Sequence, residues 1–225
     1  MLPAILQTFN MTRLFILLTT ISFACGTTSN KSNTMTIDEL LTKERSQYIA
    51  NFQLGLDQNK TAKSAIEIML QVTADQNRNQ PEIFQLNRYD MVTVNAEGKY
   101  DITEFNLNKD SVMKFDKQVY DINSMKVEIS SFVWNGCELT FNKKPNNAYE
   151  IWARKWIDID DKKKPTADGF QNVIHSVTFP EEVDGKWTTS IDFGSAPIDA
   201  FKELLGILGR QGIKKIEVHS KTFLN

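Results

Sequence analysis

Trp152, Arg154 and Trp156 are the side chains whose types and spacing most directly suggest binding chemistry. They lie in residues 148–165, AYEIWARKWIDIDDKKKP, which we predict to form a long strand followed by a charged turn. Alternate residues of a strand share one face, so these three side chains would stand in a row. Aromatic rings and a guanidinium in a row can stack on a ring or a sugar, which makes this face a candidate ligand-binding site. The alternative is that a neighbouring element covers the face and packs against the rings.

Two short motifs resemble known sites but lack the residues that those sites require. Residues 192–194 (DFG) spell the metal-binding tripeptide of protein kinases, but no glycine-rich loop or catalytic loop accompanies them. Residues 158–164 (DIDDKKK) begin like a calcium loop, yet lysines stand where the EF-hand needs an oxygen ligand and a glycine. The chain also lacks a P-loop, a dinucleotide fingerprint and a G-x-S-x-G elbow. We therefore predict no catalytic residue, no metal and no cofactor.

The two histidines, His175 and His219, offer another route to catalysis. Neither belongs to a helix-borne histidine pair or an evident histidine and acid cluster, which a zinc hydrolase normally shows. We predict that both are ordinary core or surface residues. Whether they meet across the sheet stays open at this stage. So does the pairing of acidic residues from separate strands, as glycoside hydrolases require.

The first 24 residues have the features of a signal peptide. Arg13 precedes an apolar run, residues 14–24, that is eleven residues long. A secretory h-region has about 7–15 residues, whereas a membrane-spanning helix needs about 20, so this run is too short to cross a bilayer. Residues 1–10 read as an extra leader, which leaves Met1 and Met11 as alternative starts.

Residues 22–26, SFACG, resemble the lipobox of bacterial lipoproteins, in which a small residue precedes a cysteine. The resemblance covers residues 11–34 only. It implies that Cys25 is acylated and becomes the N-terminus of the mature protein. Ser22 stands where the family usually has leucine, and Phe23 where it usually has a small residue. Because Ser22 and Ala24 also satisfy the small-x-small rule, simple secretion after the same cleavage is the alternative.

Residues 25–35 read as a flexible tether, because Gly, Thr, Ser and Asn dominate them. Cleavage removes Arg13 from the 26 basic residues and leaves all 28 acidic ones, so the formal charge changes from −2 to −3. Basic residues are scattered, which argues against a nucleic-acid partner. Residues 36–225 suit a single domain. Its one cysteine, Cys137, is an unpaired thiol if Cys25 carries lipid and a possible disulfide partner if it does not.

The domain is predicted to open with a helical hairpin. Thr36 and Glu39 form a capping-box pattern, and apolar residues follow at helical spacing to a glycine C-cap near Gly55. A second helix is predicted over residues 61–75 from the spacing of its apolar residues. After residue 81 the pattern changes to period 2, and residues 90–95 and 100–105 form a predicted hairpin.

The strongest turn signal is Asn135-Gly136, because both central positions of a type I′ turn need positive φ. It predicts a hairpin over residues 126–142 with Cys137 buried as an inert thiol. Further strands are predicted around His175 and over 187–193, then a helix after Pro197 and a strand over 213–220. A strand, helix and strand of this length favour a right-handed parallel crossover. The predicted fold is α+β, with a helical hairpin, a mostly antiparallel sheet and a C-terminal β-α-β crossover.

Together these features favour an exported, lipid-anchored cell-envelope protein that faces the periplasm or the exterior and has a non-catalytic recognition role. Its expected partners are the membrane, through the lipid on Cys25, and a protein. An immunity-type lipoprotein that blocks a toxin is one version of this role. The alternative from another class is an envelope hydrolase that uses carboxylates from separate strands.

Overall fold

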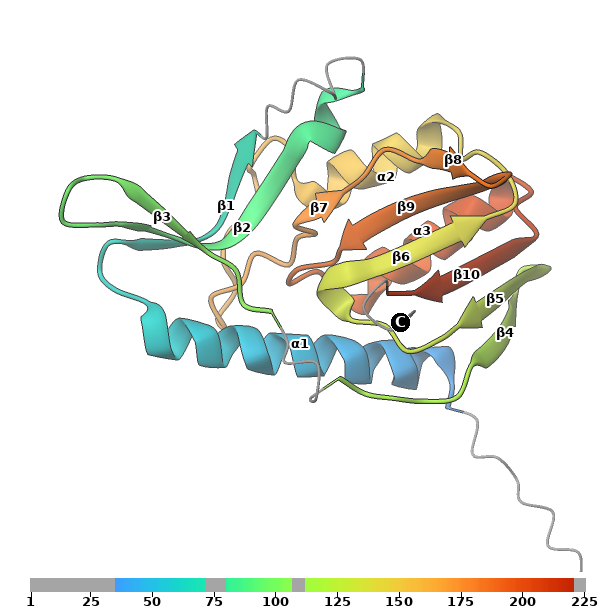
Figure 1. Ribbon diagram of the computed structural model, residues 1–225, viewed down its shortest axis with the longest axis horizontal. Helices are drawn as coiled ribbons and strands as arrows, with labels where there is room; N and C mark the ends of the chain where they lie inside the picture. Colours follow the sequence, from blue (N-terminus) through green and yellow to red (C-terminus); the bar gives the residue numbers. More distant parts are fainter. Residues whose placement is uncertain (1–34, 72–79, 107–111, 221–225) are drawn as a thin grey trace, which may run out of the picture. The chain divides into compact units, whose positions relative to one another are not determined.

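A computed structural model describes residues 35–71, 80–106 and 112–220, which belong to one compact unit, residues 34–225. A long helix, α1 (Ile37–Asn59), precedes a three-stranded and a seven-stranded sheet, and two further helices cover one face of the larger sheet (Figure 1). The predicted α+β class is confirmed. Among the described residues, no helix is both long and apolar enough to span a membrane.

Helix α1 begins at the predicted capping box. The Glu39 backbone N–H donates to Thr36 Oγ1 at 3.2 Å, and the Thr36 N–H donates to Glu39 Oε2 at 2.8 Å. This pair satisfies two of the N–H groups that a helix start leaves without partners. The buried side of α1 spans its whole length, and its members are Leu40, Leu41, Glu44, Tyr48, Phe52 and Leu56.

The predicted helix end near Gly55 is wrong, because α1 continues to Asn59. Gly55 lies inside the helix at the point where the Phe105 ring packs on it. A Cβ at this position would lie 2.2 Å from Phe105 Cδ1. Gly55 is therefore required by its packing against Phe105, and not by the end of the helix.

The smaller sheet has the order β1-β2-β3 and is antiparallel throughout, with β1 Ser64–Gln71, β2 Leu86–Val94 and β3 Tyr100–Thr103. The predicted β2–β3 hairpin is confirmed, with Gly98 at φ 75° in its turn. The predicted helix over residues 61–75 is wrong, since β1 pairs with β2 along its length. Its apolar residues fit helical spacing, but pairing with β2 decides the outcome, as tertiary context often does.

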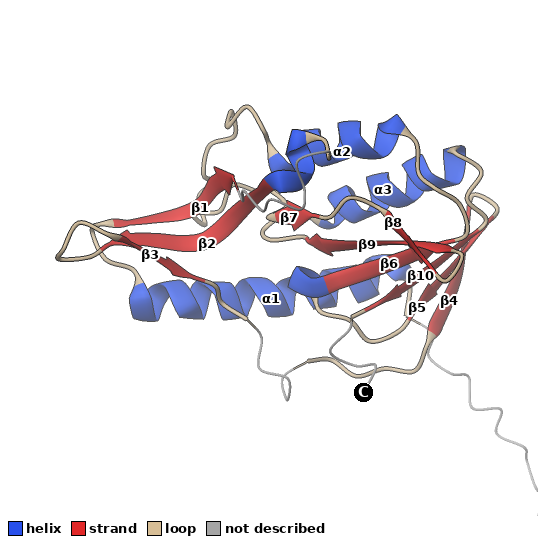
Figure 2. Ribbon diagram, turned by 45° about the horizontal axis from the view of Figure 1, so that its top comes forward, coloured by secondary structure: helices blue, strands red, loops and turns tan. Residues whose placement is uncertain are grey.

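The larger sheet has the order β4-β5-β10-β6-β9-β7, and β8 also pairs with β9 (Figure 2). Only the β10–β5 pair is parallel. The strands are β4 Gln118–Ile122, β5 Met125–Ile129, β6 Cys137–Phe141, β7 Ser176–Val177, β8 Glu181–Val183, β9 Lys186–Asp192 and β10 Lys215–His219.

Helices α2 (Asn147–Ile157) and α3 (Ile198–Arg210) lie side by side over one face of the larger sheet (Figures 1 and 2). The Trp152 indole Nε1 donates to the Ala200 carbonyl at 2.9 Å and joins them. The strand predicted for the first part of residues 148–165 is therefore wrong, since α2 takes its place, whereas the charged turn predicted after it is present at residues 158–160. Asn146 caps α2 by accepting from the Ala148 N–H, and the buried aromatic residues recur at helical spacing.

The predicted hairpin around Asn135-Gly136 is also wrong, because β10 lies between β5 and β6. The two residues belong to a single 3₁₀ turn, η4 (Trp134–Gly136). Ser220 holds this turn from the end of β10, since its hydroxyl accepts from the Val133 N–H and donates to the Gly136 carbonyl.

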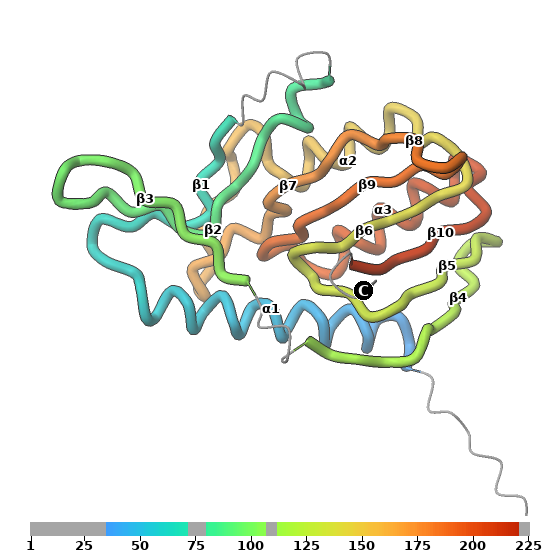
Figure 3. Tube along the Cα trace, viewed as in Figure 1, coloured from blue at the N-terminus to red at the C-terminus, as the bar shows by residue number. Residues whose placement is uncertain are grey.

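The chain runs from β9 through α3 to β10, as the trace in Figure 3 shows. Both strands are antiparallel to β6, so they run in the same direction with β6 between them. The predicted parallel crossover is confirmed in direction, although its strands are not neighbours.

We predict that Gly55→Ala lowers the free energy of unfolding by about 1–3 kcal/mol, because the new methyl group overlaps the Phe105 ring. In most helices this change stabilises by about 0.5–1 kcal/mol. Gly206→Ala in α3 is the control, since its Cβ would meet only the flexible end of Arg210 at 3.4 Å, and it should stabilise. Urea unfolding measures both. A stabilising Gly55→Ala would contradict the packing.

Candidate functional site

The predicted binding row of Trp152, Arg154 and Trp156 does not form. Trp152 is 1 % exposed, and Trp156 donates from its indole to Glu203 Oε2 at 2.8 Å. Arg154 instead pairs with Glu150 one turn away, at 2.9 Å between Nε and Oε1. The helix directs the rings toward α3 and the guanidinium along its own surface, so the three groups share no face.

Only one of the two cysteines, Cys137, lies in the part of the chain that the structure describes. Cys25 lies outside the described residues. Cys137 is a free, fully buried thiol on β6, as predicted, and burial raises its pKa well above the ordinary value. A thiol with a raised pKa is a poor nucleophile, so Cys137 is not a catalytic candidate.

Two adjoining pockets form the clearest binding surface among the described residues. One has a volume of about 250 Å³ and the other about 230 Å³, and both are lined by Phe84 and Phe179. We call the pair the groove. Each is smaller than a typical ligand pocket of about 300–1,000 Å³. The first is completed by Gln80, Thr178, Glu181, Val183, Thr188, Thr189 and Ser190, and the second by Lys144, Pro145, Asn146, Asn147, Tyr149, Glu150 and Pro180.

A β-bulge shapes the groove. Val177 pairs with Ile191 and Glu181 with Thr188, so three residues (178–180) face only two (189–190) on β9. An extra residue of this kind bends a strand and changes the direction of its side chains. Thr178 keeps the bulge hydrogen-bonded by contacts to both Thr189 and Ser190. The bulge thus brings Phe179 to within 5.2 Å of Phe84, centroid to centroid, between the two pockets.

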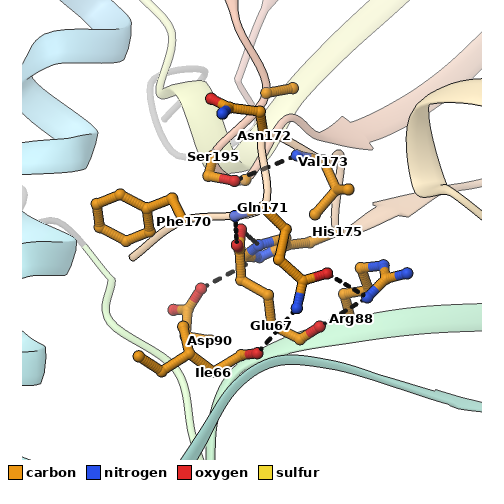
Figure 4. A network of polar contacts seen from close by, with 12 residues as sticks. Ile66, Glu67, Arg88, Asp90, Phe170, Gln171, Asn172, Val173, His175 and Ser195 are labelled. Atoms are coloured by element: carbon orange, nitrogen blue, oxygen red, sulfur yellow. Dashed lines mark hydrogen bonds and ion pairs between the residues drawn. The ribbon is translucent and has the colours of Figure 1, made fainter. Parts of the chain in front are cut away.

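The densest cluster of ionisable groups lies elsewhere, between the two sheets. Glu67 of β1 and Asp90 of β2 stand on either side of His175 (Figure 4). His175 Nε2 lies 2.9 Å from Glu67 Oε1, and Nδ1 lies 3.1 Å from Asp90 Oδ1. Asp192 at the end of β9 is 4.0 Å from Nδ1. We call these four residues the His175 cluster.

The surroundings of the cluster are equally polar and equally closed. Asp90 also accepts from the Tyr48 hydroxyl and the Phe105 N–H, and Glu67 accepts from the Gln171 N–H. Arg88, 2 % exposed, lies close by and donates to the carbonyls of Glu67, Ile157 and Asp158. Every charged group in this region therefore has partners within the protein, as buried charges require.

Electrostatics favours a charged histidine in the cluster. Burial alone lowers the pKa of His175, but the hydrogen bonds and charges of Asp90 and Glu67 raise it well above the ordinary value. For Asp90, burial acts upward, and the contacts from His175, Phe105 and Tyr48 outweigh it and lower the pKa. Burial raises the pKa of Asp192 to about 7. The cluster is thus a buried imidazolium held by two carboxylates.

This arrangement is poorly suited to catalysis. Both ring nitrogens of His175 face carboxylates, so neither is free to accept a proton from a substrate. No described pocket is lined by any of the four residues. An accessible carboxylate that interacts with the cluster is Glu104, whose pKa burial and the charges of Asp90 and Asp192 raise to about 7. It lines a separate pocket of about 220 Å³ beside α1.

The remaining sequence motifs have structural roles. In the DFG segment, Asp192 accepts from the Gly194 N–H at 2.8 Å, and a Cβ on Gly194 would overlap the His175 ring. The glycine therefore permits the close approach of His175. His219 Nε2 is 3.6 Å from Glu138 Oε1, far from His175 in the sheet. Among the described residues, no group of three or more His, Cys, Asp or Glu could hold a metal ion.

Sequence reasoning did not identify Phe84, Phe179 or Glu67 as functional or structural centres. The groove depends on the bulge at residues 178–180 and on the turn around Phe84, which are more than 90 positions apart in the chain. Neither segment has a local sequence pattern that predicts the groove. The one available signal for the cluster was His175 on an apolar strand face, since a buried histidine needs partners. Comparison of the chain with protein-family models, curated proteins and solved structures found no match.

A second buried acid, Glu44 of α1, has no partner. Both of its carboxyl oxygens are fully buried and lack a hydrogen bond within the described residues. Burial raises its pKa to about 8. The folded state therefore favours the neutral acid, whereas the unfolded chain ionises near the ordinary value of 4.5.

We predict that replacing Glu44 with glutamine flattens the pH dependence of stability. A raised folded-state pKa stabilises at low pH, and that stability is lost as pH rises from about 4.5 to about 8. Relative to wild type, Glu44→Gln should gain about 2–4 kcal/mol of unfolding free energy between pH 5 and pH 9. Urea unfolding at both pH values tests this, with exposed Glu97→Gln as control. Parallel curves for Glu44→Gln and wild type would refute it.

We further predict that His175→Leu costs about 3–5 kcal/mol at pH 7, because it leaves Glu67 and Asp90 buried without a cation. Adding Glu67→Gln and Asp90→Asn should restore part of that loss, since the uncompensated charges disappear. Denaturant titrations of the single and triple variants provide the measurement. A triple variant less stable than His175→Leu alone would show that charge pairing is not the main contribution.

Proposed function

We propose that the protein is exported, anchored to a cell-envelope membrane through lipid on Cys25, and binds a ligand in the groove without catalysing its conversion. The groove carries the proposal within the fold. Two pockets of about 250 and 230 Å³ adjoin there, with aromatic and polar side chains side by side. The apolar run before Cys25 and its lipobox resemblance support the location.

Binding is favoured over hydrolysis by the positions of the acids. The groove holds Glu150, which is paired with Arg154, and Glu181, and no histidine. The acids that do converge from separate strands surround a buried imidazolium, and they line neither the groove nor the pocket beside α1. A hydrolase of the kind considered from the sequence would need an acid and a base that both reach the substrate.

The anchor fits a chain with a polar tether. Residues 26–34 contain no apolar residue, and a tether of this composition keeps a folded domain close to the surface that holds its first residue. Acyl chains contribute about 0.8 kcal/mol per buried CH₂, and two or more chains give stable attachment. The expected partners are therefore the membrane and the occupant of the groove. A protein occupant would be the immunity-type version of this role.

We expect metabolic labelling with a palmitate analogue to mark the wild-type protein and not Cys25→Ser. Cys25→Ser should also move the protein from the membrane fraction to the soluble fraction. Cys137→Ser is the matched control and should label like wild type, because its thiol is buried. An unlabelled wild-type protein would remove the lipid from the proposal and leave secretion. Equal labelling of wild type and Cys25→Ser would place the lipid elsewhere.

A further inference from the structure

We infer that the groove binds a neutral polyhydroxylated ligand, that is, a carbohydrate. This inference rests on the proposed binding function and names its ligand class. It follows from three properties of the groove: the hydrogen-bonding groups that it leaves free, its aromatic carbon, and its balance of charge.

The first pocket presents several polar side chains that the fold does not use. Within the described residues, the side-chain polar groups of Gln80, Glu181, Thr188 and Ser190 have no hydrogen-bond or ion-pair partner. Gln80 precedes the short 3₁₀ helix η2 (Glu82–Gln85), and the other three belong to β8 and β9. All four surround one volume. Amides, hydroxyls and a carboxylate offer both donors and acceptors, which ligand hydroxyl groups match in either role. A mainly apolar ligand would leave these groups unpaired and bind weakly.

Aromatic carbon completes the complementarity. Phe84 and Phe179 meet edge to face at 76° and contribute to both pockets. The negative face of an aromatic ring attracts groups with partial positive charge. The C–H groups of a sugar ring have that character, because each carbon carries an electronegative oxygen. Phe84 is 9 % exposed and stacks on Tyr149, so it supports Phe179. The partly exposed Phe179 ring is the one on which a pyranose can pack while its hydroxyls reach the free polar groups.

The charges of the groove favour a ligand without net charge. Glu181 is its carboxylate without an ion-pair partner among the described residues, because Glu150 is paired with Arg154. Lys144 is its ammonium, and it lies over the rings of Phe179 and Trp187 at 5.6 and 4.8 Å. The formal charges of Glu181 and Lys144 cancel. Glu181 lines the first pocket and Lys144 the second, so a ligand that spans the groove meets one charge of each sign and gains no net attraction from a charge of its own.

An extended peptide fits the groove less well. A peptide would bind by adding a strand to the open edge of β8 through backbone hydrogen bonds. The edge there has only three residues, Glu181–Val183. It is preceded by the bulge, whose last residue, Pro180, has no N–H to donate. Short, acidic, bulged edges with proline are the features that prevent strand addition.

The test is a glycan array of neutral mono- to tetrasaccharides, including hexoses and N-acetylhexosamines, with uronic acid, sialylated and sulfated glycans beside them, probed with the full chain. We expect a subset of these glycans to bind, with affinities that change little between about 50 and about 500 mM NaCl, because no charge is neutralised. Calorimetry with the best oligosaccharide then measures the dissociation constant for wild type and variants.

Two variants and a control locate the binding. Glu181→Ala and Ser190→Ala should each weaken the best oligosaccharide, Glu181→Ala by roughly tenfold or more, since a charged acceptor is lost. Both side chains can be shortened without disturbing the core. Glu182→Ala is the matched control, because Glu182 is the next residue of β8 and lines neither pocket, and it should bind like wild type.

Three results would overturn the inference: no glycan binds, only charged glycans bind and high salt releases them, or Glu181→Ala and Ser190→Ala leave the affinity unchanged. A fragment library screened by NMR separates this failure from that of the proposed function. Fragments that shift the groove residues in the absence of glycan binding would leave a binding protein with a different ligand. If no glycan binds and no fragment shifts the NMR signals of the groove residues, the proposed binding function is refuted as well.

Discussion

The contact of His175 with Glu67 and Asp90 is the interaction on which the arrangement of the two sheets depends. The histidine precedes β7 of the larger sheet, and the two carboxylates belong to neighbouring strands of the smaller one. A charged group in a closed interior is tolerated only with charged and hydrogen-bonded partners. The smaller sheet therefore supplies the carboxylates that the buried imidazolium needs, and the larger sheet supplies the cation that the two buried carboxylates need. The hydrogen bond from the Arg88 N–H to the His175 carbonyl adds a backbone link at the same place.

Several local features allow the contact of His175 with Glu67 and Asp90 to form. Glu67 has φ 54°, an unusual value for a strand residue, and it places the carboxylate opposite Asp90. Gly194 has no side chain where the imidazole passes. Arg88 fixes the end of α2 to β1 and β2 through three carbonyl oxygens. The unusual backbone conformation of Glu67 and the absence of a side chain at Gly194 are thus offset by a contact that joins distant parts of the chain.

The sequence predicted what local physics decides. The Thr36 and Glu39 cap, the β2–β3 turn at Gly98 and the helix after Pro197 all rest on interactions within a few residues, and all were found. Trp152 and Trp156 misled because a spacing of four fits both alternation on a strand and one turn of a helix. Asn135-Gly136 misled because the end of β10, about 85 positions later, takes the place beside β5. The groove and the His175 cluster combine residues from across the chain, so no local pattern announces them; Glu67 and His175 are 108 positions apart.

The described chain starts at Met35, whose carbonyl accepts a hydrogen bond from Tyr120 of β4 at 3.1 Å. Strand β4 is one edge of the larger sheet, and the groove lies at the other edge, beside β7 and β8. Five inter-strand steps of about 4.8 Å separate the edges, roughly 24 Å. If lipid holds Cys25, the tether joins the domain at the edge of the sheet away from the groove. An occupant of the groove would therefore not meet the point where the tether joins the domain.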